Sequence, residues 1–95
     1  MADKHGTYRA VILFSNNKEA GGALLSLVPK ERQNKTYKVT SNPSGVVEIL
    51  KVKAGNYDVH VGAIKNPDTG EKESHQGLGL SIKGGDDLVQ KICLA

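Results

Sequence analysis

Three histidines and one neighbouring aspartate are the first candidates for chemistry in this chain. His5, His60 and His75 lie far apart in the sequence, without the close pair of ligands, such as H-x-x-x-H, that usually anchors a metal site. Asp58 and His60 are two residues apart, so on one strand they share a face and could contact one ligand. The sequence therefore predicts no metal and no cofactor, and it leaves Asp58 and His60 as candidate contact residues.

The acidic pair Asp86-Asp87 and the single cysteine have structural interpretations. A calcium ion needs about six to eight oxygen ligands, and "KGGDD" lacks the EF-hand pattern, so we expect an acidic turn before a strand. Cys93 stands between two apolar residues in "KICLA", which favours a buried small hydrophobe over a nucleophile. With no paired catalytic carboxylates and no nucleophile beside a base in the sequence, we predict that the protein is not an enzyme.

Length and charge narrow the class of protein further. Ninety-five residues make one domain, and one cysteine cannot form a disulfide within the chain. The net charge of +3 comes from basic residues that are spread along the chain among acidic ones, with only four aromatic residues, so nucleic-acid binding is not expected. No apolar run approaches the roughly 20 residues of a membrane span. We see no signal peptide, which favours a cytoplasmic protein or one carried within an assembly.

Seven short runs have the composition of β-strands and are separated by turns rich in Gly, Pro and Asn. They cover residues 8–14, 23–28, 35–40, 46–52, 56–64, 78–82 and 88–94, with a polar loop at 65–77. This pattern predicts an all-β fold, an antiparallel Greek-key β-sandwich of about seven strands, immunoglobulin-like or prealbumin-like. We expect a flexible tail over residues 1–6 and a single domain over 7–95. A helix over 86–94 is the alternative for the last element.

Two of the expected strands differ in how their apolar residues alternate. In residues 56–64, Tyr57 and Val59 share one face and are expected in the core, while Asp58 and His60 face outward. Residues 46–52 carry apolar side chains in both parities, which indicates either a bulge or a strand that is covered on both faces.

The first two thirds of the chain contain three short motifs: the pair Gly22-Ala23, the turn from Thr40 to Gly45, and the G-x-Y-x-V-x-V segment from Gly55 to Val61. Together they resemble the carboxypeptidase regulatory-domain-like and transthyretin (prealbumin)-like β-sandwich modules. The resemblance implies a β-sandwich used as a stalk, an enzyme appendage, a carrier or a part of a secretion machine. The related hydrolases end in Y-R-G-S, whereas this chain ends "KICLA". An intramolecular isopeptide bond would need a Lys on the first strand, which has only Arg9.

The remaining use of such a domain is to present a surface. We expect a non-enzymatic structural or protein-interaction module that binds a partner or itself, within a larger assembly such as a phage or secretion-machine particle. A carbohydrate-binding or small-molecule-binding module and a degenerate transthyretin-like hydrolase are the alternatives. Apolar residues outside the expected core favour self-association or a protein partner. The candidate interaction surface consists of Val46, Leu50, Val52, Asp58 and His60.

Overall fold

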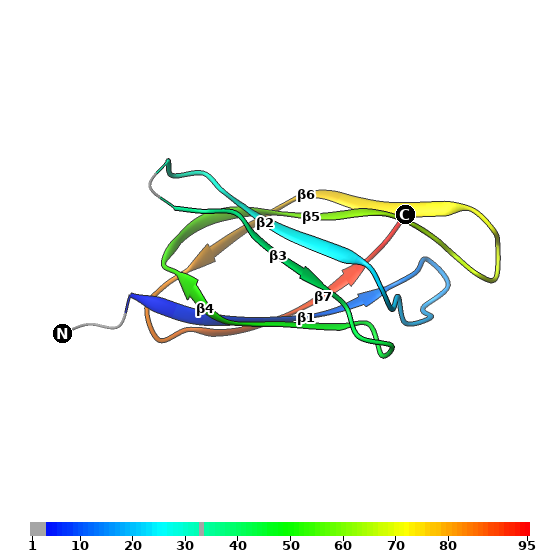
Figure 1. Ribbon diagram of the computed structural model, residues 1–95, viewed down its shortest axis with the longest axis horizontal. Helices are drawn as coiled ribbons and strands as arrows, with labels where there is room; N and C mark the ends of the chain where they lie inside the picture. The colour runs from blue at the N-terminus through cyan, green and yellow to red at the C-terminus, as the bar shows by residue number, and fades with distance from the viewer. Residues whose placement is uncertain (1–3, 33) are drawn as a thin grey trace.

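The computed structural model describes residues 4–32 and 34–95, which form two packed β-sheets with no helix among them (Figure 1). The seven strands are β1 (His5–Leu13), β2 (Leu24–Pro29), β3 (Tyr37–Thr40), β4 (Val46–Lys53), β5 (Gly55–Lys65), β6 (Lys72–Ile82) and β7 (Asp87–Cys93). The small sheet has the order β4-β1-β7 and the large sheet the order β3-β2-β5-β6. The predicted all-β sandwich is confirmed.

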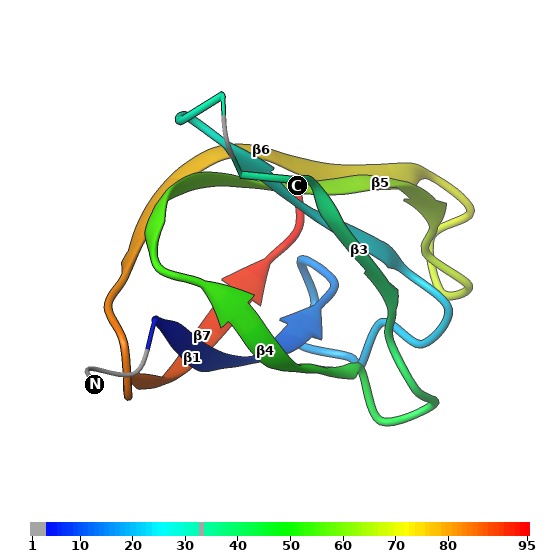
Figure 2. The ribbon, with the colours of Figure 1, turned by 60° about the vertical axis from the view of Figure 1, so that its left-hand side comes forward.

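One strand pair departs from the antiparallel arrangement that we expected. β7 runs parallel to β1 over seven consecutive residue pairs, from Thr7 opposite Asp87 to Leu13 opposite Cys93. Both strands start at the same end of the sandwich, because the turn that follows β6 delivers the chain beside the start of β1 (Figure 2). There the Thr7 N–H donates to the Asp86 carbonyl at 2.7 Å. The other four pairings are antiparallel.

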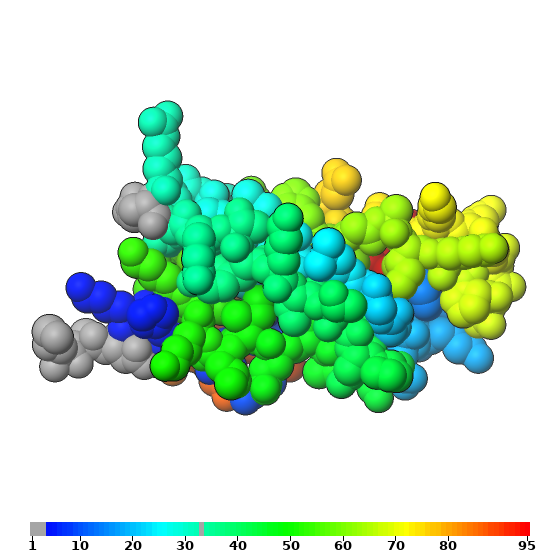
Figure 3. Space-filling model, viewed as in Figure 1, coloured from blue at the N-terminus to red at the C-terminus, as the bar shows by residue number. Residues whose placement is uncertain are grey.

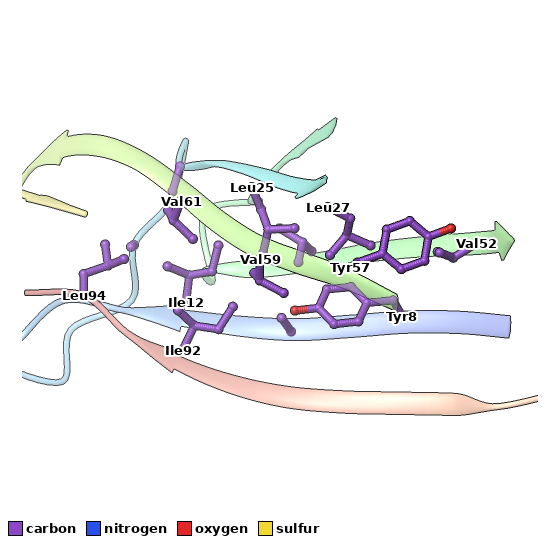
Figure 4. Close-up of a cluster of buried hydrophobic side chains, with 14 of the residues drawn as sticks. Tyr8, Ile12, Leu25, Leu27, Val52, Tyr57, Val59, Val61, Ile92 and Leu94 are labelled. Carbon is purple, nitrogen blue, oxygen red and sulfur yellow. The ribbon is translucent and has the colours of Figure 1, made fainter. Parts of the chain in front are cut away.

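The core fills the space between the two sheets and contains two fully buried tyrosines (Figure 4). The Tyr8 hydroxyl donates to Gln90 Oε1 at 2.8 Å and the Tyr57 hydroxyl donates to the Lys53 carbonyl at 2.5 Å. These bonds satisfy the polar ends of the rings, as burial requires. Tyr57 and Val59 are both completely buried, so the predicted core face of β5 is confirmed.

A β-bulge in β4 explains the mixed pattern of its sequence. Gly6 lies opposite Val52 and Tyr8 lies opposite Ile49, so two residues of β4 lie opposite one residue of β1, Thr7. The extra residue reverses the alternation, and both Val47 and Val52 are buried in the core. The interpretation of this strand as bulged is confirmed. The placement of Val52 on an outer surface was wrong.

The β5–β6 hairpin is much longer than the sequence predicted. Most of the polar segment 65–77 is not a loop: β5 continues to Lys65 and β6 begins at Lys72, so the turn covers only 66–71. The error has a physical reason, since the side chains in this part of the hairpin are largely exposed and alternation of polarity is weak there. Figure 3 shows the hairpin (yellow) at one end of the molecule, next to the β1–β2 loop (blue).

The two ends of the chain also differ from expectation. Residues 1–3 of the predicted tail lie outside the described residues, but His5 and Gly6 already belong to β1 and pair with β4. At the other end, β7 confirms the predicted strand, and the alternative of a helix over 86–94 is wrong. Cys93 is exposed, not buried, because its neighbours Ile92 and Leu94 take the positions that face the core.

Candidate interaction surface

An apolar patch lies on the outer face of the small sheet. Side chains of β1 alternate between the core and this face, so the residues between Tyr8, Ala10 and Ile12 are turned outward and are half-buried. We call the apolar residues of this face the small-sheet patch: Val11, Leu13, Val46, Leu50 and Val89. Leu50 and Val89 are the most exposed, with 63% and 69% of their surface accessible. Exposed apolar side chains gathered on one face are typical of an interaction site.

The pairing of the strands places part of this patch side by side. Val11 lies directly opposite Val46 on one side and Lys91 on the other. Leu13 follows Val11 on the same face and lies opposite Cys93. Leu50 is exposed at the bulge, where its carbonyl accepts a hydrogen bond from Thr7 Oγ1 at 3.2 Å.

One arginine links all three strands across the patch. Arg9 Nε donates to Glu48 Oε2 of β4 at 2.6 Å, and Arg9 Nη1 donates to Asp87 Oδ1 of β7 at 2.5 Å. The hydrogen bonds with Glu48 and then Asp87 raise the pKa of Arg9 above its ordinary value. Since these groups are exposed, the ion pairs add little to stability. Their effect is to hold charges of both signs in fixed places among apolar neighbours.

The structure separates the residues that we predicted as one surface. Val46 and Leu50 lie on the outer face of the small sheet, whereas Val52 is in the core. Asp58 and His60 lie on the outer face of the large sheet, on the opposite side of the sandwich, because Val59 between them points into the core. Asp58 Oδ1 is 3.6 Å from Lys30 Nζ of the loop after β2.

Three residues of the patch were missed: Val11, Leu13 and Val89. The signal for Val11 and Leu13 was their alternation with buried residues in "YRAVIL". Val89 has the same parity as Asp87 and Lys91, and this marks an exposed face. The sequence of β7 has apolar residues in both parities, but it could not show that β7 lies beside β1.

The histidines do not converge. His5, His60 and His75 lie on β1, β5 and β6. His75 is directly opposite Val61, whose side chain faces the core, whereas His60 faces outward. His75 Nε2 is buried and has no hydrogen-bond partner among the described residues. Within the described part of the chain, no group of three His, Cys, Asp or Glu side chains could hold a metal ion.

A cavity of about 410 Å³ lies where β1 begins, between the β4 bulge and the β6–β7 turn. Its lining residues are His5, Gly6, Thr7, Leu50, Lys51, Gly85, Asp86 and Asp87. Asp86 Oδ2 accepts a hydrogen bond from the Lys83 N–H at 2.9 Å, so the expected acidic turn is confirmed. The polar groups of this cavity could contact a small polar molecule.

A buried carboxylate at the far end of the sandwich holds the β5–β6 hairpin to the β1–β2 loop. Glu73 Oε1 accepts from the Ser15 N–H at 2.7 Å, and Glu73 Oε2 accepts from Ser15 Oγ at 2.9 Å and from Asn66 Nδ2 at 3.0 Å. Donation by Asn66, and then by Ser15, lowers the pKa of Glu73. We call these three residues the hairpin clasp. Both carboxylate oxygens of Glu73 accept hydrogen bonds within the clasp, so we assign it a structural role.

No family model matches the sequence, and no curated protein does. Among solved structures, BcpA, the major pilin subunit of Bacillus cereus, matches with a TM-score of 0.66 and 19% identity over 96% of this chain, which spans 30% of the pilin subunit. A proposed carbohydrate-binding protein from Pseudomonas aeruginosa matches with a TM-score of 0.64 and 8% identity, over 98% of this chain and 90% of that one.

A third match is to a 9R-lipoxygenase from Cyanothece, with a TM-score of 0.52 and 16% identity over 95% of this chain and 16% of the lipoxygenase. At these identities the similarity shows the β-sandwich fold alone. The narrower resemblance to carboxypeptidase-regulatory and transthyretin-like modules stays a prediction.

No helix of the described residues is long and apolar enough to cross a membrane.

Proposed function

We propose that this protein is a non-enzymatic β-sandwich module that associates with a second copy of itself through the outer face of the small sheet. The observation that carries this proposal is the small-sheet patch, above all Leu50 and Val89 with about two thirds of their surface exposed. Burying apolar surface contributes about 25 cal/mol per Å². A partner that covers these side chains therefore gains favourable free energy without any change in the fold.

The charges on the same face support a second copy of this chain as the partner. Arg9 and Lys91 alternate with Glu48 and Asp87, so the face carries both signs and is complementary to a copy of itself. A strongly acidic or basic partner would find no matching field. Self-association is also what a structural subunit requires, and one of the similar structures is a pilin subunit. A larger assembly, such as a phage or secretion-machine particle, is part of this proposal.

Carbohydrate or small-molecule binding is the second candidate, and the cavity beside the β4 bulge favours it. Its lining supplies hydrogen-bonding groups from Thr7, Lys51 and Asp86. Sugar sites usually add an exposed aromatic ring, and the described residues include none: Tyr8, Phe14 and Tyr57 are buried, and Tyr37 is half-buried and packs edge-on against Tyr57 at 6.0 Å. The absence of a stacking ring makes the cavity the weaker candidate.

The proposal is tested by following backbone amide chemical shifts as the protein concentration is raised from about 10 μM to about 500 μM, the range in which small interfaces form. We expect shifts confined to β4, β1 and β7. Leu50→Lys should suppress them, whereas Leu24→Lys, which changes a similarly exposed leucine on the large sheet, should not. Spectra that do not change with concentration would contradict the proposed function.

A further inference from the structure

β7 presents an unpaired edge of regular backbone. It is the last strand of the small sheet in the described chain, with β1 on one side only. The Asp86 carbonyl and the Leu94 N–H bond to β1, through Thr7 N and Leu13 O. Ala95 instead exchanges two hydrogen bonds with Ser74 of β6, on the other side. Backbone groups of a strand alternate in direction, so Asp87, Val89 and Lys91 point their N–H and C=O groups away from β1.

The side chains of these three residues complement each other about a twofold axis. Asp87, Val89 and Lys91 are all exposed on the outer face. Natural edge strands are often protected from pairing by a lysine. Here the residue four positions before Lys91 is an aspartate, with Val89 midway between them. In an antiparallel pair of β7 strands centred on Val89, each Lys91 would lie opposite Asp87 of the second copy. The charge of Lys91, which would otherwise hinder pairing, would then attract Asp87 of the second copy.

We propose that two copies pair their β7 strands antiparallel, with Val89 opposite Val89 and Asp87 opposite Lys91, so that the two small sheets join into one six-stranded sheet. This inference goes beyond the proposed function: joining the β7 edges is a second contact between copies, and it leaves Leu50 and the rest of the outer face of the six-stranded sheet free for the face-to-face contact. In this register the unpaired backbone groups can form hydrogen bonds across the new strand pair, because the N–H and C=O groups of Asp87, Val89 and Lys91 all point away from β1. It also places Val89, the most exposed valine of the described residues, opposite Val89 of the second copy.

The neighbouring registers are less favourable. Centring the pair on Gln90 places Val89 opposite Lys91 and removes both ion pairs. Centring it on Lys91 places two ammonium groups opposite each other, which is destabilising. The other edges are poorer templates as well: β3 has four residues, β4 is bulged, and β6 contains Gly77 at a φ of +82°.

Disulfide trapping tests the register. In a Cys93→Ser background, Val89→Cys places two thiols opposite each other, at the Cα separation of about 5.5 Å that suits a disulfide. The control is the unchanged chain, which keeps Asp87 and Lys91 and whose two exposed Cys93 thiols would be roughly 26 Å apart along the strands in this register. We expect mild oxidation to convert most of the Val89→Cys variant to a covalent dimer, and little of the control. Equal trapping of both, or trapping of the control alone, would overturn the inference while leaving the proposed function intact.

Charge reversal gives an independent test. Lys91→Glu opposes like charges in a homodimer, and so does Asp87→Lys, so each should raise the dimer dissociation constant about tenfold or more. A mixture of the two variants restores opposite charges and should form a heterodimer. Lys38→Glu, on β3 at the edge of the large sheet, makes the same change of net charge as Lys91→Glu and should leave dimerisation unchanged. Because Asp87→Lys removes an ion pair with Arg9, its thermal unfolding is measured first. A mixture that associates no better than either variant alone would contradict the inference.

Discussion

Two tyrosines with their hydroxyls bonded to protein atoms anchor the core at the scale of single residues. Tyr57 is fully buried and packs against Tyr37, while His60, three positions along the same strand, faces the outside. The same strand therefore offers one position that is sensitive to truncation and one that is not. This difference follows from burial alone.

Tyr57→Ala should lower the free energy of unfolding by about 3 kcal/mol or more, because it leaves a cavity in the core. Tyr57→Phe, which removes only the hydroxyl that donates to Lys53 O, should cost about 1 kcal/mol. His60→Ala should change it by less than about 0.5 kcal/mol. Urea denaturation measures all three. Similar losses for Tyr57→Ala and His60→Ala would mean that the facing of β5 is wrong.

The hairpin clasp makes stability depend on pH. The pKa of Glu73 is lowered in the folded state, so the ionised carboxylate stabilises the fold. This contribution is present above the ordinary glutamate range and is lost as the pH falls through the lowered pKa. We expect the urea concentration at the midpoint of unfolding to decrease as the pH is lowered from neutral to acidic. The decrease should be smaller in Glu73→Gln. An identical pH dependence in the two proteins would show that Glu73 is not responsible.

At the scale of elements, a glycine sets the turn between β3 and β4. Gly45 has a φ of +78°, and a Cβ atom there would lie 2.5 Å from the Ile12 carbonyl oxygen. The Ile12 N–H in turn donates to the Gly45 carbonyl at 2.7 Å. The turn is thus held against β1 at a distance that only glycine allows.

Gly45→Ala should therefore destabilise the protein by more than Gly22→Ala. Gly22 has nearly the same φ, +77°, but nothing lies within 4 Å of its Cβ position. The control should cost about 1 kcal/mol for the backbone conformation, and Gly45→Ala about 2 kcal/mol or more because of the added clash. Thermal unfolding compares the two. Equal costs would mean that the close approach to Ile12 relaxes freely.

The individual strands also show how much of the fold could be predicted from the sequence. Alternation in β5 correctly predicted Tyr57 and Val59 as core, because a half-buried strand shows its faces directly. The mixed phase of β4 correctly indicated a bulge, but sequence could not place the extra residue, so Val52 was put on the wrong face. The long hairpin and the parallel β1–β7 pair were not predicted. Both depend on partners distant in sequence, and local composition does not record them.

On the scale of the whole molecule, the candidate interaction surface depends on that same pairing. Val11, Leu13, Val46 and Val89 form one patch only because β4, β1 and β7 are neighbours. Asp58 and His60, predicted as part of the same surface, lie on the other side of the sandwich. We therefore propose that one face of the sandwich, and one edge of that face, are responsible for association.

Sedimentation equilibrium of the purified chain, alone and as Val89→Lys, tests this central claim most directly. Two copies joined through β7 should give a mass twice that of the 10.1 kDa chain at about 100 μM, and Val89→Lys should return it to the monomer mass. Leu24→Lys serves as the control and should sediment like the unchanged protein. A mass of 10.1 kDa for the unchanged chain at every concentration would contradict the account.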